Sequence, residues 1–247
     1  MIVNILVLFL SATVGGIFYW LVPEQKGDGY KLSLIFAGTY LFSITIIHLI
    51  PEIYSSPIGG VNAGIYMLLG YFLQQILEYF TSGVEHGHIH HHEGHSHNHA
   101  SLGIVSVVLA LSVHAFLEGG LLAQPSTMHA SHQGETLLAG IVLHKIPAAY
   151  ALMAIATMQM KSRRKALLLL LAFALASPLG YILSDYSQTN DLVSDKTILI
   201  LISLVCGSFL QISTTIAFES SPLHKFNLKS FLVAGAGAIV AIVAELI

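Results

Sequence analysis

The chain of 247 residues is too apolar for an ordinary soluble protein, because 55% of its residues are hydrophobic and only 9% are charged. This composition indicates an integral membrane protein, and the formal net charge of -3 gives no sign of a nucleic-acid partner. The single cysteine, Cys206, excludes a disulfide bond within the chain.

Eight apolar segments are long enough to cross a bilayer, which requires about 20 residues of helix. We therefore expect an all-α polytopic membrane protein, with one transmembrane domain over residues 1–247 and an uncleaved first helix. The third, fourth and fifth segments contain polar side chains, so hydropathy alone could miss one of them. The predicted helices are Ile2–Val22, Leu32–Pro51, Gly60–Phe80, Ser101–Ala123, Glu135–Met160, Ala166–Ser184, Thr197–Phe218 and Ser230–Ile247.

The basic residues predict the orientation of these helices. With eight spans, the loops after the first, third, fifth and seventh helices lie on one side of the membrane. That side holds Lys26, Lys31, Lys161, Arg163, Arg164, Lys165, Lys225 and Lys229, and the loops opposite hold only Lys196. Because loops rich in Lys and Arg stay in the cytoplasm, we expect both termini outside a plasma (inner) membrane.

A weak internal repeat links the second and seventh predicted helices. The stretch "GTYLFSITII" begins at Gly38, and "GSFLQISTTI" begins at Gly207. The two helices would cross the membrane in opposite directions, as in a transporter built from inverted repeats. Ser, Thr and Gly also serve ordinary helix packing, so this second interpretation stays open.

Three ionisable residues lie inside the fourth and fifth predicted helices. His114 and Glu118 are four residues apart, which places them on one face of a helix, and His144 lies in the next helix. Each such group costs on the order of 2.5–3.5 kcal/mol at mid-membrane depth unless it faces a polar site. Two imidazoles and a carboxylate suit zinc or a similar cation. The alternative is a set of hydrogen bonds that join the helices without a metal.

At these residues the chain resembles the ZIP family of zinc and iron transporters. The resemblance rests on "HAFLEG" and "HKIPAAYAL" in the fourth and fifth helices, with "HLIPE" in the second and "ASPLG" in the sixth. It implies eight helices, inverted repeats around a central helix pair, and His114, Glu118 and His144 as the metal ligands. The implied substrate is zinc, with cadmium, iron or manganese as other candidates, moved into the cytoplasm.

The sequence departs from the two-metal pattern of many ZIP members at four positions. Ala115, Lys145, Ala148 and Ser177 stand where such members carry ligands of a second, adjacent metal. We therefore expect a single-metal site, in which the Lys145 ammonium substitutes for the charge of a second cation. Lys145 reaching toward the membrane interface is the alternative.

Other polar residues are candidates for a pathway to and from this site, or else ordinary residues at helix ends. Glu78 and Glu245 are predicted to be boundary residues of this second kind. The pathway candidates are His48, Glu52, Ser177, Gln211 and Glu219.

A histidine-rich segment lies within residues 81–100, between the third and fourth helices. Its eight histidines are His86, His88, His90, His91, His92, His95, His97 and His99. Imidazoles bind metals and titrate near neutral pH, so the segment could be a metal trap, a pH-sensing tether or a soluble linker. Its predicted cytoplasmic position favours a mobile loop that accepts the metal.

Two other functions compete with metal uptake. A zinc exporter of the cation-diffusion type can carry histidine-rich loops, but it usually has six spans and a soluble C-terminal domain. An intramembrane metalloenzyme would require a motif such as HExxH, which the sequence lacks. We therefore predict a transporter and not an enzyme, with a divalent metal ion and the lipid bilayer as partners and a homodimer as a candidate assembly.

Overall fold

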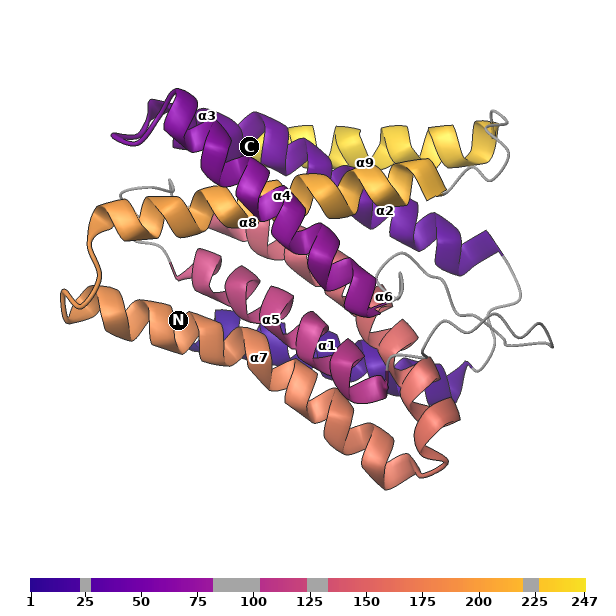
Figure 1. The fold of residues 1–247 in the computed structure, drawn as a ribbon. Helices are drawn as coiled ribbons and strands as arrows, with labels where there is room; N and C mark the ends of the chain where they lie inside the picture. Colours follow the sequence, from indigo (N-terminus) through magenta and orange to yellow (C-terminus); the bar gives the residue numbers. More distant parts are fainter. Residues whose placement is uncertain (23–27, 82–102, 124–132, 220–226) are drawn as a thin grey trace.

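A computed structural model describes residues 1–22, 28–81, 103–123, 133–219 and 227–247. The described residues form helices and short connections, with no β-strand among them, so the predicted all-α class is confirmed (Figure 1). The helices are α1 (Ile2–Leu21), α2 (Asp28–Ile44), the π-helical turn η1 (Thr45–Leu49), α3 (Ile50–Ser55), α4 (Val61–Thr81), α5 (Ile104–Leu122), α6 (Gln133–Met160), α7 (Arg163–Thr189), α8 (Asp195–Glu219) and α9 (Leu228–Leu246).

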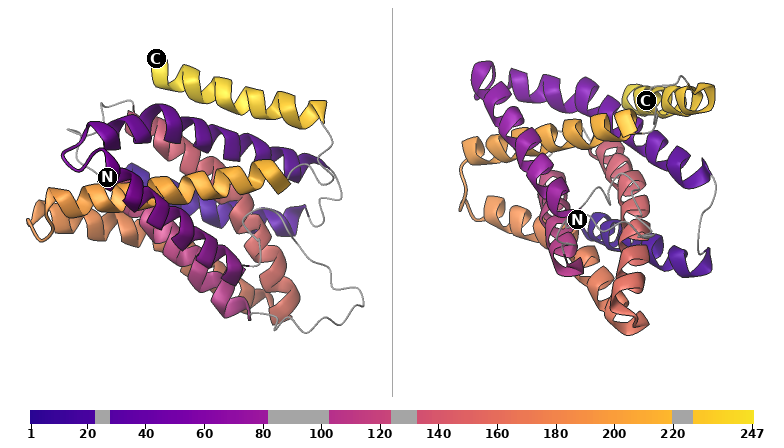
Figure 2. Two further views of the ribbon diagram at one scale, coloured as in Figure 1. Left: turned by 45° about the horizontal axis from the view of Figure 1, so that its top comes forward. Right: turned by 45° about the vertical axis from the view of Figure 1, so that its right-hand side comes forward.

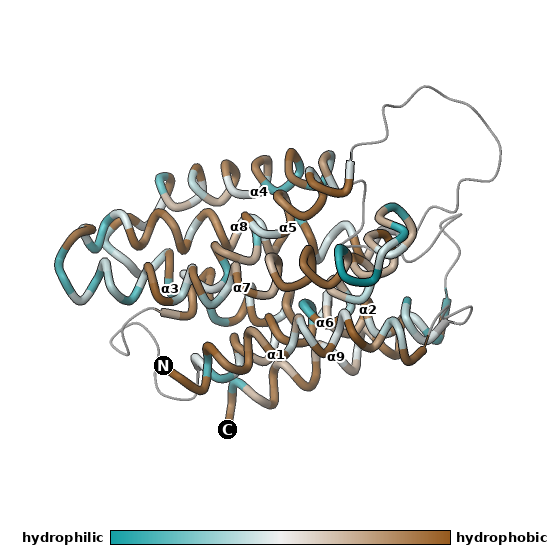
Figure 3. Tube along the Cα trace, turned by 90° about the horizontal axis from the view of Figure 1, so that it is seen from below, coloured by the Kyte–Doolittle hydropathy of each residue, from teal (hydrophilic) through white to brown (hydrophobic). Residues whose placement is uncertain are grey.

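The eight predicted segments agree with eight long helices in these ranges, with α2, η1 and α3 forming one continuous helix from residue 28 to 55. Seven of the eight are long and apolar enough to cross a membrane. The exception is α4, in which Gln74, Gln75 and Glu78 interrupt the apolar sequence, as its composition led us to expect. Figure 3 shows hydrophobic residues along most of the helical length.

Large apolar side chains cover much of the outer surface. Leu168, Leu175 and Leu179 on α7 are 66%, 46% and 56% exposed. A soluble protein rarely exposes continuous apolar surface of this kind, whereas a bilayer solvates it. The exposed leucines therefore mark a face of the bundle suited to lipid.

The helices pack in two groups. The first group contains α1, α5, α6 and α7, in which α5 packs closely on α7 and α1 on α6. The second group contains α2, α4, α8 and α9, in which α4 packs on α8 and α2 on α9. Figure 1 shows α2, α4, α8 and α9 above α1, α5 and α7. The groups meet where α2 contacts α6 and where α4 contacts α5. Both views of Figure 2 show α9 at the edge of the bundle.

Glycines bring paired helices into backbone contact. A Cβ atom at Gly119 of α5 would clash with the backbone of Ser177, and one at Gly180 of α7 would clash with that of Phe116. The same relation joins α4 and α8, where a Cβ at Gly207 would clash with the backbone of Met67. Between apolar helices in a membrane, close packing of this kind supplies much of the attraction.

The π-helical turn places His48 inside the bundle. The π-helical turn lies shortly before Pro51, which has no backbone N–H to donate to the preceding turn. The Thr45 hydroxyl donates to the Leu41 carbonyl at 2.8 Å, and Thr45 and His48 are both buried. Single π-helical turns occur frequently at functional sites.

The two segments of the weak internal repeat lie in α2 and α8, which contact each other. Their proximity does not distinguish repeated structure from ordinary packing of small residues, so the inverted repeat stays a prediction.

We predict that Gly207→Ala destabilises the protein, because the added methyl group forces α4 and α8 apart. Overpacking of this kind costs roughly 1–3 kcal/mol. The measurement is the thermal unfolding temperature of purified protein in detergent. The matched control is Gly235→Ala on α9, where a Cβ meets no atom within 4 Å. Equal unfolding temperatures for the two variants would contradict this account of the packing.

Candidate metal centre

Three side chains predicted as ligands converge in the first helix group. His114 and Glu118 extend from α5 and His144 from α6, and one ligand atom from each lies within 4.8 Å of the other two. His114 Nε2 lies 3.1 Å from Glu118 Oε1. The rings of His114 and His144 are nearly perpendicular, at 87°, with centroids 6.1 Å apart. All three residues are at most 4% exposed, so the cluster is enclosed by protein.

Lys145 completes the charge balance of this cluster. Its Nζ donates a hydrogen bond to Glu118 Oε2 at 2.6 Å, and the side chain is only 3% exposed. The ammonium group also lies 5.4 Å from the ring centre of Phe173, which adds a cation–π contact. Glu118 therefore faces His114 through one oxygen and Lys145 through the other. The alternative that Lys145 extends to the membrane interface does not match this buried position.

The other three positions expected to lack second-metal ligands are buried beside the cluster. Ala115 and Ala148 contribute only methyl groups and are 0% and 3% exposed. The Ser177 hydroxyl donates to the Ala115 carbonyl at 2.7 Å, which ties α7 to α5. Lys145 is thus the one charged side chain among the four substituted positions.

A second polar cluster joins the continuous helix formed by α2, η1 and α3 to α6 and α9. His48 Nδ1 lies 2.9 Å from Glu245 Oε1, and His48 Nε2 lies 3.6 Å from Glu52 Oε2. The Thr136 hydroxyl donates to Glu245 Oε2 at 3.0 Å, and the Tyr40 hydroxyl donates to the Thr136 carbonyl at 3.1 Å. The structure therefore corrects the interpretation of Glu245 as only a boundary residue. The sequence signal for this role was a carboxylate directly after the apolar residues 231–244 of α9.

Gln211 and Glu78 connect α8 to α4. The Gln211 amide donates to the Glu78 carboxylate and, at 3.1 Å, to the Thr215 hydroxyl. Glu78 does lie near the end of α4, as predicted, but its carboxylate also serves this contact between helices. The side chain of Glu219 and all eight loop histidines lie outside the described residues, so their predicted roles stay predictions.

Sequence reasoning did not identify a hydrogen-bonded chain behind His114. The Ser208 hydroxyl on α8 donates to Gln74 Oε1 on α4 at 2.8 Å, and the same hydroxyl lies 3.2 Å from His114 Nδ1. All three side chains are buried. No spacing rule connects residues on three separate helices, so only the assembled bundle reveals this contact.

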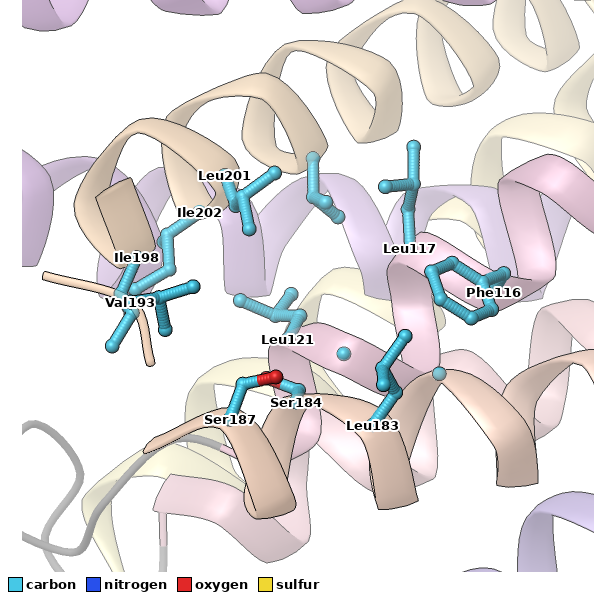
Figure 4. Close-up of a pocket in the computed structure, with 13 residues that line it drawn as sticks. Phe116, Leu117, Leu121, Leu183, Ser184, Ser187, Val193, Ile198, Leu201 and Ile202 are labelled. Atoms are coloured by element: carbon cyan, nitrogen blue, oxygen red, sulfur yellow. The ribbon is translucent and has the colours of Figure 1, made fainter. Parts of the chain in front are cut away.

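The apolar pocket in Figure 4 does not include His114, Glu118 or His144 among its lining residues. It has a volume of about 160 Å³ and lies between α5, α7 and α8, with Phe116, Leu121, Leu183 and Ile202 among its walls. Serine hydroxyls at Ser184 and Ser187 are its few polar groups, and none of the three cluster residues lines it. Its chemistry does not suit a divalent cation.

Comparison with known proteins agrees with the family resemblance. Residues 100–244 match the family model described as ZIP Zinc transporter. This match covers more than half of the chain, including both helices of the central cluster. No curated protein gives a significant match to the chain.

The chain therefore belongs to the ZIP family of metal transporters, and its apolar helices identify it as an integral membrane protein. Family membership supports transport of divalent metal over the enzymatic alternative.

We predict that Lys145→Met destabilises the metal-free protein, because it leaves the Glu118 carboxylate buried without its cation. Breaking a buried ion pair costs roughly 3–5 kcal/mol. Zinc should restore much of this loss, so the rise in unfolding temperature on zinc addition should be larger in the variant than in the parent protein. An unchanged metal-free stability would contradict the proposed charge balance.

Proposed function

We propose that this protein carries zinc, or a similar divalent cation, into the cytoplasm through a site formed by His114, Glu118 and His144. The main support for this proposal is that their ligand atoms converge within 4.8 Å in the interior of an apolar bundle. These groups are expensive to bury separately, and a shared cation satisfies all three together.

The spacing of the ligands supports this proposal. Zinc binds His nitrogen and carboxylate oxygen at about 2.0–2.2 Å, so two ligands at a tetrahedral angle lie roughly 3.4 Å apart. The separation of 3.1 Å between His114 Nε2 and Glu118 Oε1 is close to that value. His144 then needs only a small side-chain movement to complete three protein ligands. An open fourth position suits a transported ion, which must also be released.

Lys145 supports a single-ion site. Its ammonium group occupies one oxygen of Glu118 and places a fixed positive charge beside the cluster. A second divalent ion there would meet repulsion at close range in a medium of low dielectric constant. We therefore propose that Lys145 supplies the charge that a second metal supplies in two-metal relatives, and that it stays in place during transport.

The proposal also includes the residues along the path of the ion and the direction of transport. His48 and Glu52 offer ligand atoms on the side that the basic loops predict to be external, with Glu245 held against His48. Ser177 and Gln211 are buried and offer neutral oxygen atoms, and Glu219 is assigned to the cytoplasmic end. The loop histidines are proposed to accept the released ion weakly and exchange it rapidly.

We predict that His144→Ala abolishes most zinc uptake into proteoliposomes that contain a zinc-sensitive dye. The variant loses one of three ligands, and two remaining groups cannot hold the ion against its hydration. Glu118→Ala and His114→Ala should behave in the same way.

The matched control is Val113→Ala, which alters the residue beside His114 on the outer face, where Val113 is 46% exposed. It should keep parental uptake. Normal uptake by a well-inserted His144→Ala variant would leave the cluster as a set of contacts between helices and would rule out the site.

We also predict that the connection between α6 and α7 is cytoplasmic. A cysteine introduced as Ser162→Cys should be protected from a membrane-impermeant thiol reagent in intact cells, and Ser187→Cys at the other end of α7 should react. The background is low because Cys206, the natural cysteine, is buried. The opposite labelling pattern would reverse the direction of transport proposed here.

A further inference from the structure

Gln74 and Ser208 lie in the second helix group, whereas His114, Glu118 and His144 lie in the first. The Ser208 hydroxyl donates to Gln74 Oε1 at 2.8 Å, and its oxygen lies 3.2 Å from His114 Nδ1. Gln74 is 1% exposed and Ser208 is 5% exposed, so bulk water does not compete for these bonds. The contact therefore acts on the one ring nitrogen of His114 that faces away from Glu118.

The single proton of the Ser208 hydroxyl decides which partner donates in the hydrogen bond between Ser208 and His114. A serine hydroxyl has one proton, and here Gln74 Oε1 receives it. Toward His114, Ser208 can then only accept, which requires a proton on Nδ1. In a neutral imidazole the other nitrogen, Nε2, then carries the lone pair. That atom is the one 3.1 Å from Glu118 Oε1, on the side of the proposed ion.

From this geometry we propose that Gln74 and Ser208 are positioning residues that hold His114 in its Nδ1–H tautomer and so prepare Nε2 to bind the transported cation. The inference rests on the proposed function of the cluster. In the metal-free protein the Nε2 lone pair then faces a Glu118 oxygen at 3.1 Å, an unfavourable contact between two acceptors that a bound cation removes.

The reversed orientation of the Gln74 side-chain amide would give the other tautomer of His114. If the Gln74 amide nitrogen donated to Ser208, the serine proton would go to His114 Nδ1, and Nε2 would carry the hydrogen toward Glu118. The ion would then have to displace that hydrogen before it could bind. The two arrangements differ in the tautomer of one ring, which can be measured directly.

The location of the pair also relates metal affinity to helix packing. His114 belongs to α5, whereas Gln74 and Ser208 belong to α4 and α8. Polar groups that support metal-binding histidines typically contribute 10–100-fold to metal affinity. A change in the contact between the two helix groups would therefore alter the readiness of His114 to bind.

The test is zinc binding by calorimetry with the full-length purified protein, after the eight loop histidines are replaced by serine to remove weak binding there. Ser208→Ala and Gln74→Leu should each weaken binding 10–100-fold in protein that remains folded. Ser208→Thr keeps the hydroxyl and should preserve most of the affinity. The matched control is Ser203→Ala, a fully buried serine of α8 that donates only to the Leu199 carbonyl of its own helix.

A second measurement reads the tautomer of His114 in protein whose Gln74 and Ser208 are unchanged. Nitrogen-15 NMR of the histidine-labelled, metal-free protein, with His114→Ala used to assign the signal, should show the Nδ1–H tautomer at His114. A neutral Nε2–H tautomer, or unchanged affinity in both Ser208→Ala and Gln74→Leu, would overturn the inference.

His144→Ala separates this outcome from failure of the proposed function. If His144→Ala binds zinc like its parent, the central site itself is wrong. If it loses binding while Ser208→Ala retains it, the site stands and only the positioning role is wrong.

Discussion

A carboxylate inside an apolar bundle must be neutralised, and the pairing of Glu118 with Lys145 meets this requirement. The two side chains are at most 3% exposed, and Lys145 Nζ lies 2.6 Å from Glu118 Oε2, so little water screens their charges. An unpaired buried charge costs several kcal/mol, which makes Glu118 dependent on a cation at all times. Lys145 supplies one such cation permanently, and the remaining oxygen of Glu118 stays directed toward the two histidines.

The helix packing keeps these groups in place. Backbone contact at Gly119 and Gly180 fixes α7 against α5, and the Ser177 hydroxyl adds a hydrogen bond to the Ala115 carbonyl beside His114. On the other side, Ser208 of α8 reaches the same histidine. The surroundings of His114 therefore include α7 and α8, which belong to different groups.

The sequence predicted the helices and the central cluster because both follow from local rules. Apolar length determines the spans, and the separation of four residues between His114 and Glu118 places them on one helical face. The roles of Glu245, Gln74 and Ser208 could not be predicted in this way. Each depends on contacts between residues about 94 to 197 positions apart, for which helical periodicity carries no information. Lys145 was an intermediate case, since its substitution pattern suggested a charge role and the bundle supplied its partner.

Anomalous diffraction from crystals grown with cadmium tests the central claim most directly, since cadmium is a zinc-like cation with strong anomalous scattering. The account predicts one well-occupied peak between α5 and α6, coordinated by His114, Glu118 and His144, with the Lys145 ammonium still beside Glu118. Two adjacent, well-occupied peaks would contradict the single-ion site. A peak elsewhere, with none at these three residues, would contradict the site itself.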